Sequence, residues 1–112
     1  MTRNEEILRS AISGKLAVYA IYEGRKRWLC PHVLGHKGGT LHVLAYQYAG
    51  ESSSKPMVPP PIPSDGPAGN WRCMDVATMR DLEVQPLGPW YTCKRHTVRQ
   101  SCIDTGLVEV AD

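Results

Sequence analysis

Several short segments of this chain divide their side chains between two faces with a period of two. In the first of them, residues 16–22, both faces are mostly apolar, and one face carries Leu16, Val18, Ala20 and Tyr22. The same alternation returns in residues 25–29, 41–48, 71–76 and 82–85. This period is typical of β-strands. With turn signals between the segments, the pattern predicts a mainly β fold, a small and strongly bent antiparallel barrel of about five strands.

A short helix is predicted at the start of the chain. Thr2-x-x-Glu5 forms a capping box, in which each of the two side chains satisfies a free backbone N–H of the first turn. One apolar stripe follows, made of Ile7, Leu8, Ala11 and Ile12. We expect Gly14 to end the helix in a left-handed conformation. The stripe is expected to cover an open end of the barrel, and a dimer face is the alternative.

Turn signals separate the strands. Glu23-Gly24 and Lys37-Gly38-Gly39 each predict a turn, because glycine tolerates positive φ. Pro31 cannot donate to a β-ladder, so we expect it to end the strand over residues 25–29 or to lie on an edge. Residues 51–69 hold three consecutive Ser and most of the Pro, which predicts a mobile loop. Residues 86–112 are expected to form a C-terminal extension with edge strands at 102–104 and 107–110.

Length and charge limit the classes of function. A chain of 112 residues is expected to form one domain over residues 1–112. The net charge of +2 argues against non-specific coating of DNA or of an anionic membrane. The acidic, polar N-terminus and the absence of a long apolar run predict a cytoplasmic protein with no membrane partner. In such a reducing compartment the four cysteine residues are expected to be free thiols.

The candidate site residues follow the predicted strands in the order Tyr22, Arg27, His42, Tyr46 and Arg72. A guanidinium group presents a planar fork of donors that fits a phosphate or a carboxylate. Aromatic side chains beside such groups hold nucleotides or single-stranded nucleic acid by stacking. These residues therefore predict a ligand-binding surface. The alternative is that both arginines are surface residues paired with Glu23, Asp75 or Glu83.

Catalytic, metal and cofactor chemistry is not predicted. Cys30, His32 and His36 offer soft and imidazole ligands, but a second pair of ligands at matching spacing is missing. No glycine-rich phosphate loop, paired-carboxylate motif or metallohydrolase pattern occurs in the sequence. We therefore expect a protein that is not an enzyme and that needs no metal and no cofactor.

The spacing of several residues over about residues 5–85 resembles the WYL domain. The matching positions are Ala11-Ile12, Tyr22, Arg27, Pro31 and Trp71-Arg72. Two positions depart from the family pattern. Leu41-His42-Val43 stands where Trp-Tyr-Leu is usual, and Asp75 stands where a second arginine is common.

The resemblance implies an SH3-like or Sm-like barrel that senses nucleotide-like or nucleic-acid ligands, a module often joined to a helix-turn-helix. This chain has no recognition helix, so by itself it is not expected to read DNA as a transcription factor. We expect a stand-alone, non-enzymatic binding module for an anionic nucleotide or single-stranded nucleic acid. The alternative is a protein-interaction domain whose barrel edge or Pro-rich loop docks a partner. A regulatory protein and a second copy of the chain are the protein partners considered.

Overall fold

A computed structural model describes residues 2–50, 71–90 and 103–110. These residues form one α-helix, six strands and a short 3₁₀ turn. The elements are α1 (Arg3–Gly14), β1 (Ala17–Tyr22), β2 (Arg25–Lys37), β3 (Thr40–Gly50), β4 (Trp71–Asp75), η2 (Val76–Thr78), β5 (Arg80–Gln85) and β6 (Thr105–Glu109). The prediction of a mainly β fold with a short N-terminal helix is confirmed.

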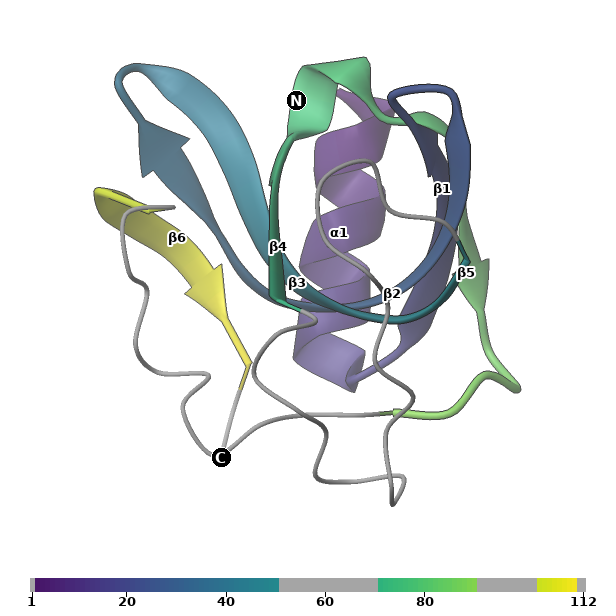
Figure 1. Cartoon of the computed structure of the whole chain (residues 1–112). Coiled ribbons are helices and arrows are strands. Elements are labelled where there is room, and N and C mark those ends of the chain that lie inside the picture. The colour runs from purple at the N-terminus through teal and green to yellow at the C-terminus, as the bar shows by residue number, and fades with distance from the viewer. Residues whose placement is uncertain (1, 51–70, 91–102, 111–112) are drawn as a thin grey trace.

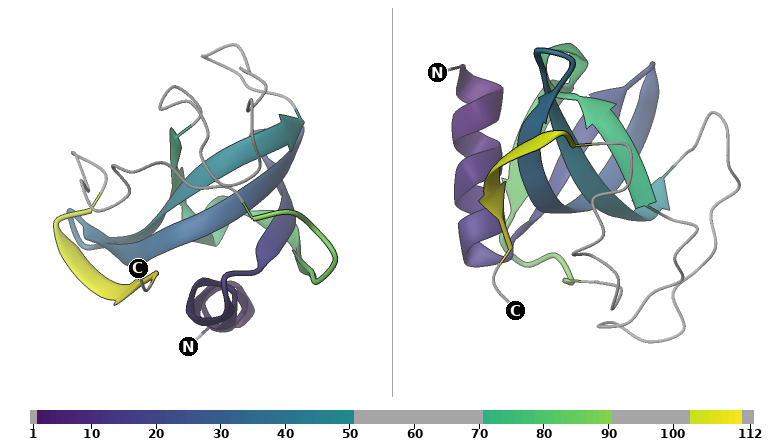
Figure 2. Two further views of the ribbon diagram at one scale, coloured as in Figure 1. Left: turned by 90° about the horizontal axis from the view of Figure 1, so that it is seen from below. Right: turned by 90° about the vertical axis from the view of Figure 1, so that its left-hand side faces the viewer.

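The six strands form one antiparallel sheet in the order β4-β3-β2-β1-β5, and β6 pairs with the second half of β2. Figures 1 and 2 show the sheet curving around α1, with the long strands β2 and β3 bending most. The sheet is not closed by hydrogen bonds, because β4 and β5 stand at its two ends. The structure thus contains one strand more than the predicted five.

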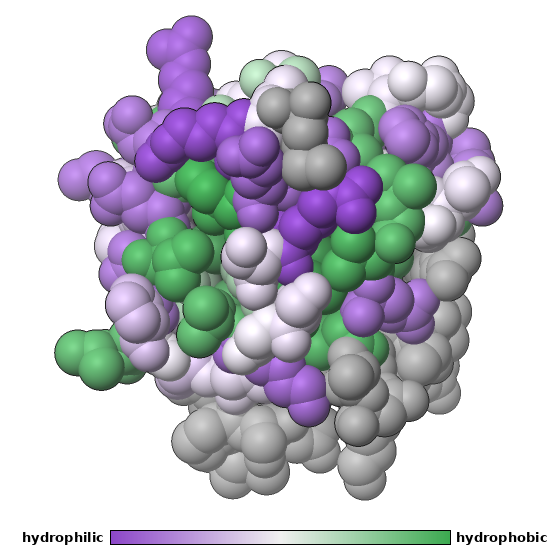
Figure 3. Space-filling view, turned by 180° about the vertical axis from the view of Figure 1, so that it is seen from behind, coloured by the Kyte–Doolittle hydropathy of each residue, from purple (hydrophilic) through white to green (hydrophobic). Residues whose placement is uncertain are grey.

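Helix α1 packs across one opening of the curved sheet, behind the strands in Figure 1. Leu8, Ala11 and Ile12 of the predicted stripe are fully buried there. Figure 3 views this side of the molecule and shows hydrophilic residues running across it between smaller hydrophobic areas. The apolar stripe of the helix is therefore buried against the sheet of the same chain, as expected for a helix that covers one opening of the sheet.

The ends of the helix differ in detail from the prediction. The Thr2 hydroxyl accepts a hydrogen bond from the Glu5 backbone N–H at 3.2 Å, as expected. The Glu5 carboxylate pairs instead with Arg9, one turn along the helix, at 3.0 Å. The left-handed residue at the C-terminal end is Lys15, with φ of 54°, and not Gly14. The helix therefore runs through Gly14 and ends one residue later than predicted.

The prediction that Pro31 ends a strand is wrong, whereas the alternative, an edge position, agrees with the structure, because among the described residues Pro31 pairs with a strand on one side only. Strand β2 continues through Pro31 to Lys37, and Pro31 pairs with Ala45 of β3. The register shifts between Pro31 and Val33. A bulge of this kind accommodates proline inside a sheet because the ladder is already interrupted there. It also bends β2, so one strand pairs with β1 over its first half and with β6 over its second half.

The buried side chains of the sheet divide between two apolar faces, an inner face and an outer face. The inner face packs on α1 and holds Val18, Ala20, Leu29, Leu34, Val43, Ala45, Met74 and Leu82. The outer face holds Ala17, Cys30, Val33, Leu44 and Tyr46. Residues on both faces at the centre of β2 and β3 are buried. These two strands are therefore the middle of the fold.

Gly35 lies where β2 meets β6. A Cβ atom at this position would collide with the Thr105 carbonyl and would lie 2.6 Å from the Ile103 Cγ2 atom. We expect Gly35→Ala to lower the free energy of unfolding by about 1–3 kcal/mol, because the backbone of β6 must move away. Urea denaturation measures the loss, and faster amide hydrogen exchange confined to residues 105–109 would show that β6 is the part displaced.

Gly14→Ala is the matched control for this substitution. A Cβ atom at Gly14 would lie 3.4 Å from the Cγ atom of Leu16, which is ordinary contact. The residue is helical, where alanine is favoured over glycine. We expect this variant to be at least as stable as the wild type. Equal stability of the two alanine variants would contradict a tight β2–β6 contact at Gly35.

The cysteines do not all behave as predicted. Cys30 is buried and free. Cys73 is disulfide-bonded, with its partner outside the described residues. The expectation of free thiols is therefore wrong for Cys73. The predicted loop over residues 51–69 also lies outside the described residues. Of the C-terminal extension, residues 105–109 form β6, close to the predicted edge strand at 107–110.

Candidate functional site

Polar residues replace apolar ones at one end of the inner face. Tyr22 ends β1, Arg27 lies near the start of β2, Gln47 lies near the end of β3, and Arg72 lies near the start of β4. Each stands an even number of residues from an inner-face apolar residue on its own strand. Alternation along a strand therefore points all four toward the same space. The structure brings together three of the five predicted site residues.

Arg27 is the centre of this group and is only 2% exposed. Its guanidinium donates to the Tyr22 carbonyl at 3.4 Å, to Gln47 Oε1 at 3.4 Å and to Glu23 Oε1 at 3.3 Å. Its Cζ atom lies 5.3 Å from the centre of the Tyr22 ring. Arg27 therefore holds the side chain of Tyr22 and the turn that follows β1. The alternative interpretation was that Arg27 is a surface residue paired with an acidic side chain. The burial of Arg27 contradicts the surface position, whereas its ion pair with Glu23 agrees with the pairing.

Arg72 is also buried, with 7% of its surface exposed. Its Nη1 atom donates to the carbonyl of Trp71 at 3.0 Å. Burial lowers the pKa of the Arg72 guanidinium from its ordinary value, and the nearby charge of Arg27 lowers it further. Two like charges are thus held close together inside the fold.

His42 and Tyr46 are not brought to this group. Both lie on the opposite side of β3 from Val43 and Ala45, and so on the outer face. Tyr46 is fully buried, with its ring centre 5.6 Å from that of Trp71. His42 Nδ1 lies 3.0 Å from the Thr40 carbonyl. The structure therefore does not bring these two residues together with the arginines, because the strand period places them on the other face of β3.

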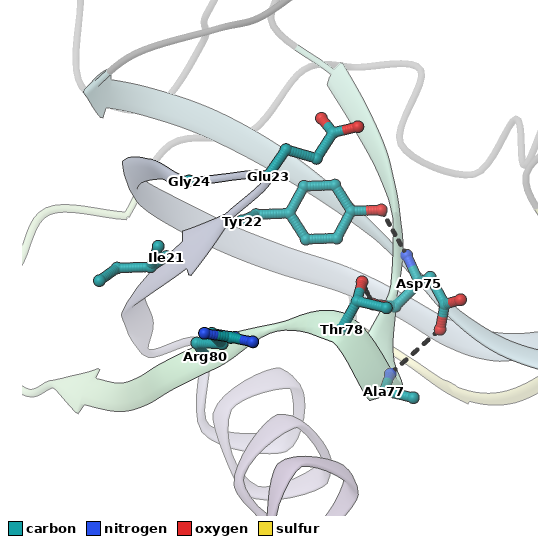
Figure 4. Close-up of a pocket in the computed structure, with 8 residues that line it drawn as sticks. All are labelled: Ile21, Tyr22, Glu23, Gly24, Asp75, Ala77, Thr78 and Arg80. Atoms are coloured by element: carbon teal, nitrogen blue, oxygen red, sulfur yellow. Dashed lines mark hydrogen bonds between the residues drawn. The ribbon is translucent and has the colours of Figure 1, made fainter.

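A pocket opens beside Tyr22, between the β1–β2 turn and the segment from Asp75 to Arg80. Its volume is about 700 Å³, and it is lined by Ile21, Tyr22, Glu23, Gly24, Asp75, Ala77, Thr78 and Arg80. Figure 4 shows the Tyr22 ring extending across the pocket toward Asp75. The Tyr22 hydroxyl accepts a hydrogen bond from the Asp75 backbone N–H at 3.0 Å. This bond joins β1 to the end of β4.

Asp75 also shapes the other wall of the pocket. Its Oδ1 atom accepts from the Ala77 backbone N–H at 3.1 Å and caps the turn η2. The Thr78 hydroxyl donates to the Asp75 carbonyl at 3.0 Å. η2 is also tied to α1, because the Asn4 side chain donates to the Val76 carbonyl at 3.0 Å. The wall that faces Tyr22 is therefore rigidly held.

Arg80 supplies an accessible positive charge to the pocket. It pairs with Ile21 in the β1–β5 ladder and is exposed. Within the part of the chain that the structure describes, its guanidinium makes no hydrogen bond and no ion pair. Sequence reasoning missed Arg80 and the pocket role of Asp75. The available signal was the polar break at residues 78–81 between two strands, since such breaks often line binding sites.

A second group of aromatic residues lies on the outer face. The ring of His32, which is fully buried, is centred 4.7 Å from that of Trp71 and 4.8 Å from that of Trp90. Its Nδ1 atom lies 2.7 Å from the Cys30 carbonyl. Among the described residues no three His, Cys, Asp or Glu residues are placed to hold a metal ion. We assign this group to packing.

No family model matches this chain, and no curated protein or solved structure is significantly similar to it. The candidate site is therefore defined by its geometry alone. Over residues 2–50, 71–90 and 103–110, no helix is long and apolar enough to cross a membrane.

Proposed function

We propose that this domain is a non-enzymatic binding module that recognises an anionic, nucleotide-like ligand or single-stranded nucleic acid in the Tyr22 pocket. The observation that carries the proposal is the combination of an aromatic ring and an exposed guanidinium in one pocket. A pocket of about 700 Å³ lies within the usual range for small-molecule sites. Tyr22 supplies apolar contact area for a base, and Arg80 supplies a donor fork for a phosphate.

The charges around the pocket favour an anion. The charged groups in contact with the pocket or behind it are Glu23, Arg27, Arg72, Asp75 and Arg80. Glu23 is already paired with Arg27. Asp75 has one oxygen occupied by the N-terminus of η2. Arg80 brings an exposed positive charge to the pocket, and this charge is the basis for expecting an anionic group there.

Arg27 and Arg72 have a supporting part in this proposal. Their burial keeps them from direct contact with a large ligand in this conformation. Arg27 instead positions Tyr22 and Glu23. This assignment differs from the sequence-based expectation, in which the two guanidinium groups were the first contacts of the ligand.

We also propose that the curved sheet is a small barrel of the SH3-like or Sm-like kind. The Tyr22–Asp75 hydrogen bond joins β1 to β4 across the gap in the strand ladder, and α1 covers one opening. The resemblance of Tyr22, Arg27 and Trp71-Arg72 to the WYL domain supports a sensing role of this kind. A cytoplasmic location stays a prediction from the sequence, and the disulfide at Cys73 favours an oxidising compartment instead.

A protein-interaction domain is the second candidate. It is supported by the ends of the sheet, since β4 and β5 each pair with one strand only within the described residues. An unpaired strand edge can accept an extended segment of a partner by adding a strand. This candidate does not use the pocket, so ligand binding in the pocket separates the two.

Arg80→Gln tests the proposed function. We expect the variant to bind a fluorescently labelled nucleoside monophosphate about tenfold more weakly than the wild type, because a charge-assisted hydrogen bond to phosphate is lost. Wild-type affinity should also fall as salt is raised. Lys37→Gln is the matched control, since Lys37 is an exposed cation at the opposite hairpin. Equal affinity of the wild type and Arg80→Gln, or no binding by the wild type, would contradict the proposal.

A further inference from the structure

The outer face of the sheet is covered at one end and open at the other. Ala17 and Cys30 are buried on this face, in a cluster packed with Trp90. Tyr19 and Trp28 lie on the same face, because each stands two residues along its strand from one of these buried residues. Both are only half-buried. The open end of the outer face therefore presents two aromatic side chains to solvent.

Tyr19 and Trp28 form a cross-strand aromatic pair. They stand directly opposite each other in the β1–β2 ladder. Their ring centres are 5.1 Å apart, and their planes are inclined at 56°. Such a pair stabilises the hairpin, and it also holds each ring against the other at the surface. Aromatic rings fixed in this way are the platforms on which unpaired bases stack.

A row of cations lies beside the aromatic pair. Ile21 pairs with Lys26 on β2 and with Arg80 on β5, so the three side chains stand in one row across the sheet. Ile21 is two residues from Tyr19 on β1, which separates the two rows by about 7 Å. Lys26 and Arg80 are exposed, and neither forms an ion pair with another described residue. A nucleotide whose base lies on the aromatic row can thus place its phosphate at the cation row.

The acidic residues of β5 favour this orientation. Asp81 and Glu83 are exposed, and Glu83 pairs with Tyr19 at the end of the aromatic row. A phosphate is repelled from that end. Lys26 lies on β2, which β1 separates from β5. Lys26 is therefore the phosphate contact that these carboxylates weaken least.

We propose that this open face is a second binding site, a platform for single-stranded nucleic acid in which bases stack on Tyr19 and Trp28 and phosphates bind Lys26 and Arg80. The inference rests on the proposed function, because Arg80 and Ile21 also line the Tyr22 pocket (Figure 4). It adds that the ligand is a strand of several nucleotides, which continues from the pocket onto the outer face. Stacking reads no base edge, so we expect little sequence preference.

Titration calorimetry of the full chain with thymidine monophosphate and with a thymidine hexanucleotide tests the inference. The monophosphate occupies one site at a time, whereas the hexanucleotide reaches the pocket and the platform together. We expect the hexanucleotide to bind at least about tenfold more tightly, the gain from one further stacked base. An abasic hexamer carries the same phosphates without bases and should lose this gain.

Trp28→Ala locates the stacking contact. We expect this variant to bind the hexanucleotide about tenfold more weakly than the wild type, because one aromatic face of the platform is removed. Leu107→Ala is the control, since Leu107 is an apolar side chain exposed on β6, and it should leave the affinity unchanged. Thermal melting and circular dichroism confirm that both variants are folded.

Trp28→Phe keeps an aromatic face and supplies a second readout. Binding of the hexanucleotide should quench tryptophan fluorescence in the wild type, because a base comes into contact with Trp28. The rings of Trp71 and Trp90 pack instead against His32, which is buried. We expect Trp28→Phe to bind within about threefold of the wild-type affinity and to lose most of the quenching.

Lys26→Gln locates the phosphate contact. We expect the slope of log affinity against log salt concentration to become shallower by about 0.7, the value for one phosphate of a single strand. Lys37→Gln is the matched control, because Lys37 is an exposed lysine at the other end of β2. It should leave the slope unchanged. Equal slopes for Lys26→Gln and the wild type would overturn the assignment of phosphate binding to Lys26.

The outcomes separate the two proposals. A hexanucleotide that binds no more tightly than the monophosphate would overturn the platform and leave the proposed function standing. A gain that is kept by the abasic hexamer, or that survives in folded Trp28→Ala, would overturn stacking on this face. Quenching that persists in full in Trp28→Phe would do the same. No binding of either ligand would overturn both proposals.

Discussion

Leu29→Ala is expected to lower the free energy of unfolding by about 2–5 kcal/mol. Leu29 is fully buried on the inner face of β2 and packs in the cluster shared with α1. Strand β2 pairs with β1, β3 and β6, so no nearby element can collapse into the cavity without breaking a ladder. The loss therefore includes both the transfer of the side chain to water and the cost of the cavity.

Leu87→Ala is the matched control, because it makes the same chemical change at a leucine that is fully exposed. We expect its unfolding curve in urea to superimpose on that of the wild type. Both variants should keep the wild-type slope against urea if the transition stays two-state. A loss below about 1 kcal/mol in Leu29→Ala would mean that the centre of the sheet can repack, which contradicts the close packing described here.

Arg27→Ala is expected to lower the free energy of unfolding by about 3 kcal/mol, the upper range for hydrogen bonds to a charged group. The substitution removes the donor from the Tyr22 carbonyl, from Gln47 and from Glu23 at once. It also removes the aliphatic stem from a buried position. Chemical denaturation measures the loss, and nucleotide affinity should fall as well because Tyr22 is no longer held.

Two further variants define this role of Arg27. Lys26→Ala changes an exposed neighbour on the same strand and should leave stability unchanged. Arg27→Lys keeps the charge but lacks the planar fork, so we expect it to recover only part of the lost stability. Full recovery in Arg27→Lys would show that charge alone matters. A folded, fully stable Arg27→Ala that binds no nucleotide would instead make Arg27 a direct ligand contact.

The burial of both arginines changes the part that they play in the proposed function. Arg27 and Arg72 were expected on the surface of the site, and the structure places them beneath it. Their mutual proximity lowers the pKa of Arg72, with burial as the larger cause. Under the proposed function, ligand affinity and fold stability are linked through Arg27, because it holds Tyr22 of the pocket and is itself buried.

The sequence predicted the local elements well for identifiable reasons. Thr2 and the stripe with Leu8 and Ile12 placed α1, because capping and helical periodicity act within a few residues. Glu23 and Gly24 formed the first turn, with φ of 54° and 73°. The strand alternation over residues 16–22 and 41–48 also matched β1 and β3. Each of these signals is complete within a short stretch of chain.

The continuation of β2 past Pro31 was not predictable from local rules. Proline removes a ladder donor, and on that ground a strand should stop. The strand continues because pairing with β3 resumes at Val33 after a register shift, and β6 pairs on the other side. From Val33 to Lys37 the strand pairs with β3, the next strand along the chain, and also with β6, which is distant in sequence. The bulge at Pro31 is thus a result of tertiary pairing.

The amino-acid sequence by itself determined the mainly β composition, the N-terminal helix, the positions of the turns and the strand face that Tyr22 shares with Val18 and Ala20. Only the tertiary structure decided that Arg27 and Arg72 lie buried near Tyr22, that His42 and Tyr46 do not join them, and that Asp75 and Arg80 line one pocket with Tyr22. The physical reason is that alternation assigns a residue to one of two faces, whereas convergence depends on register and on the bending of the sheet. Those quantities are set by pairings between distant strands.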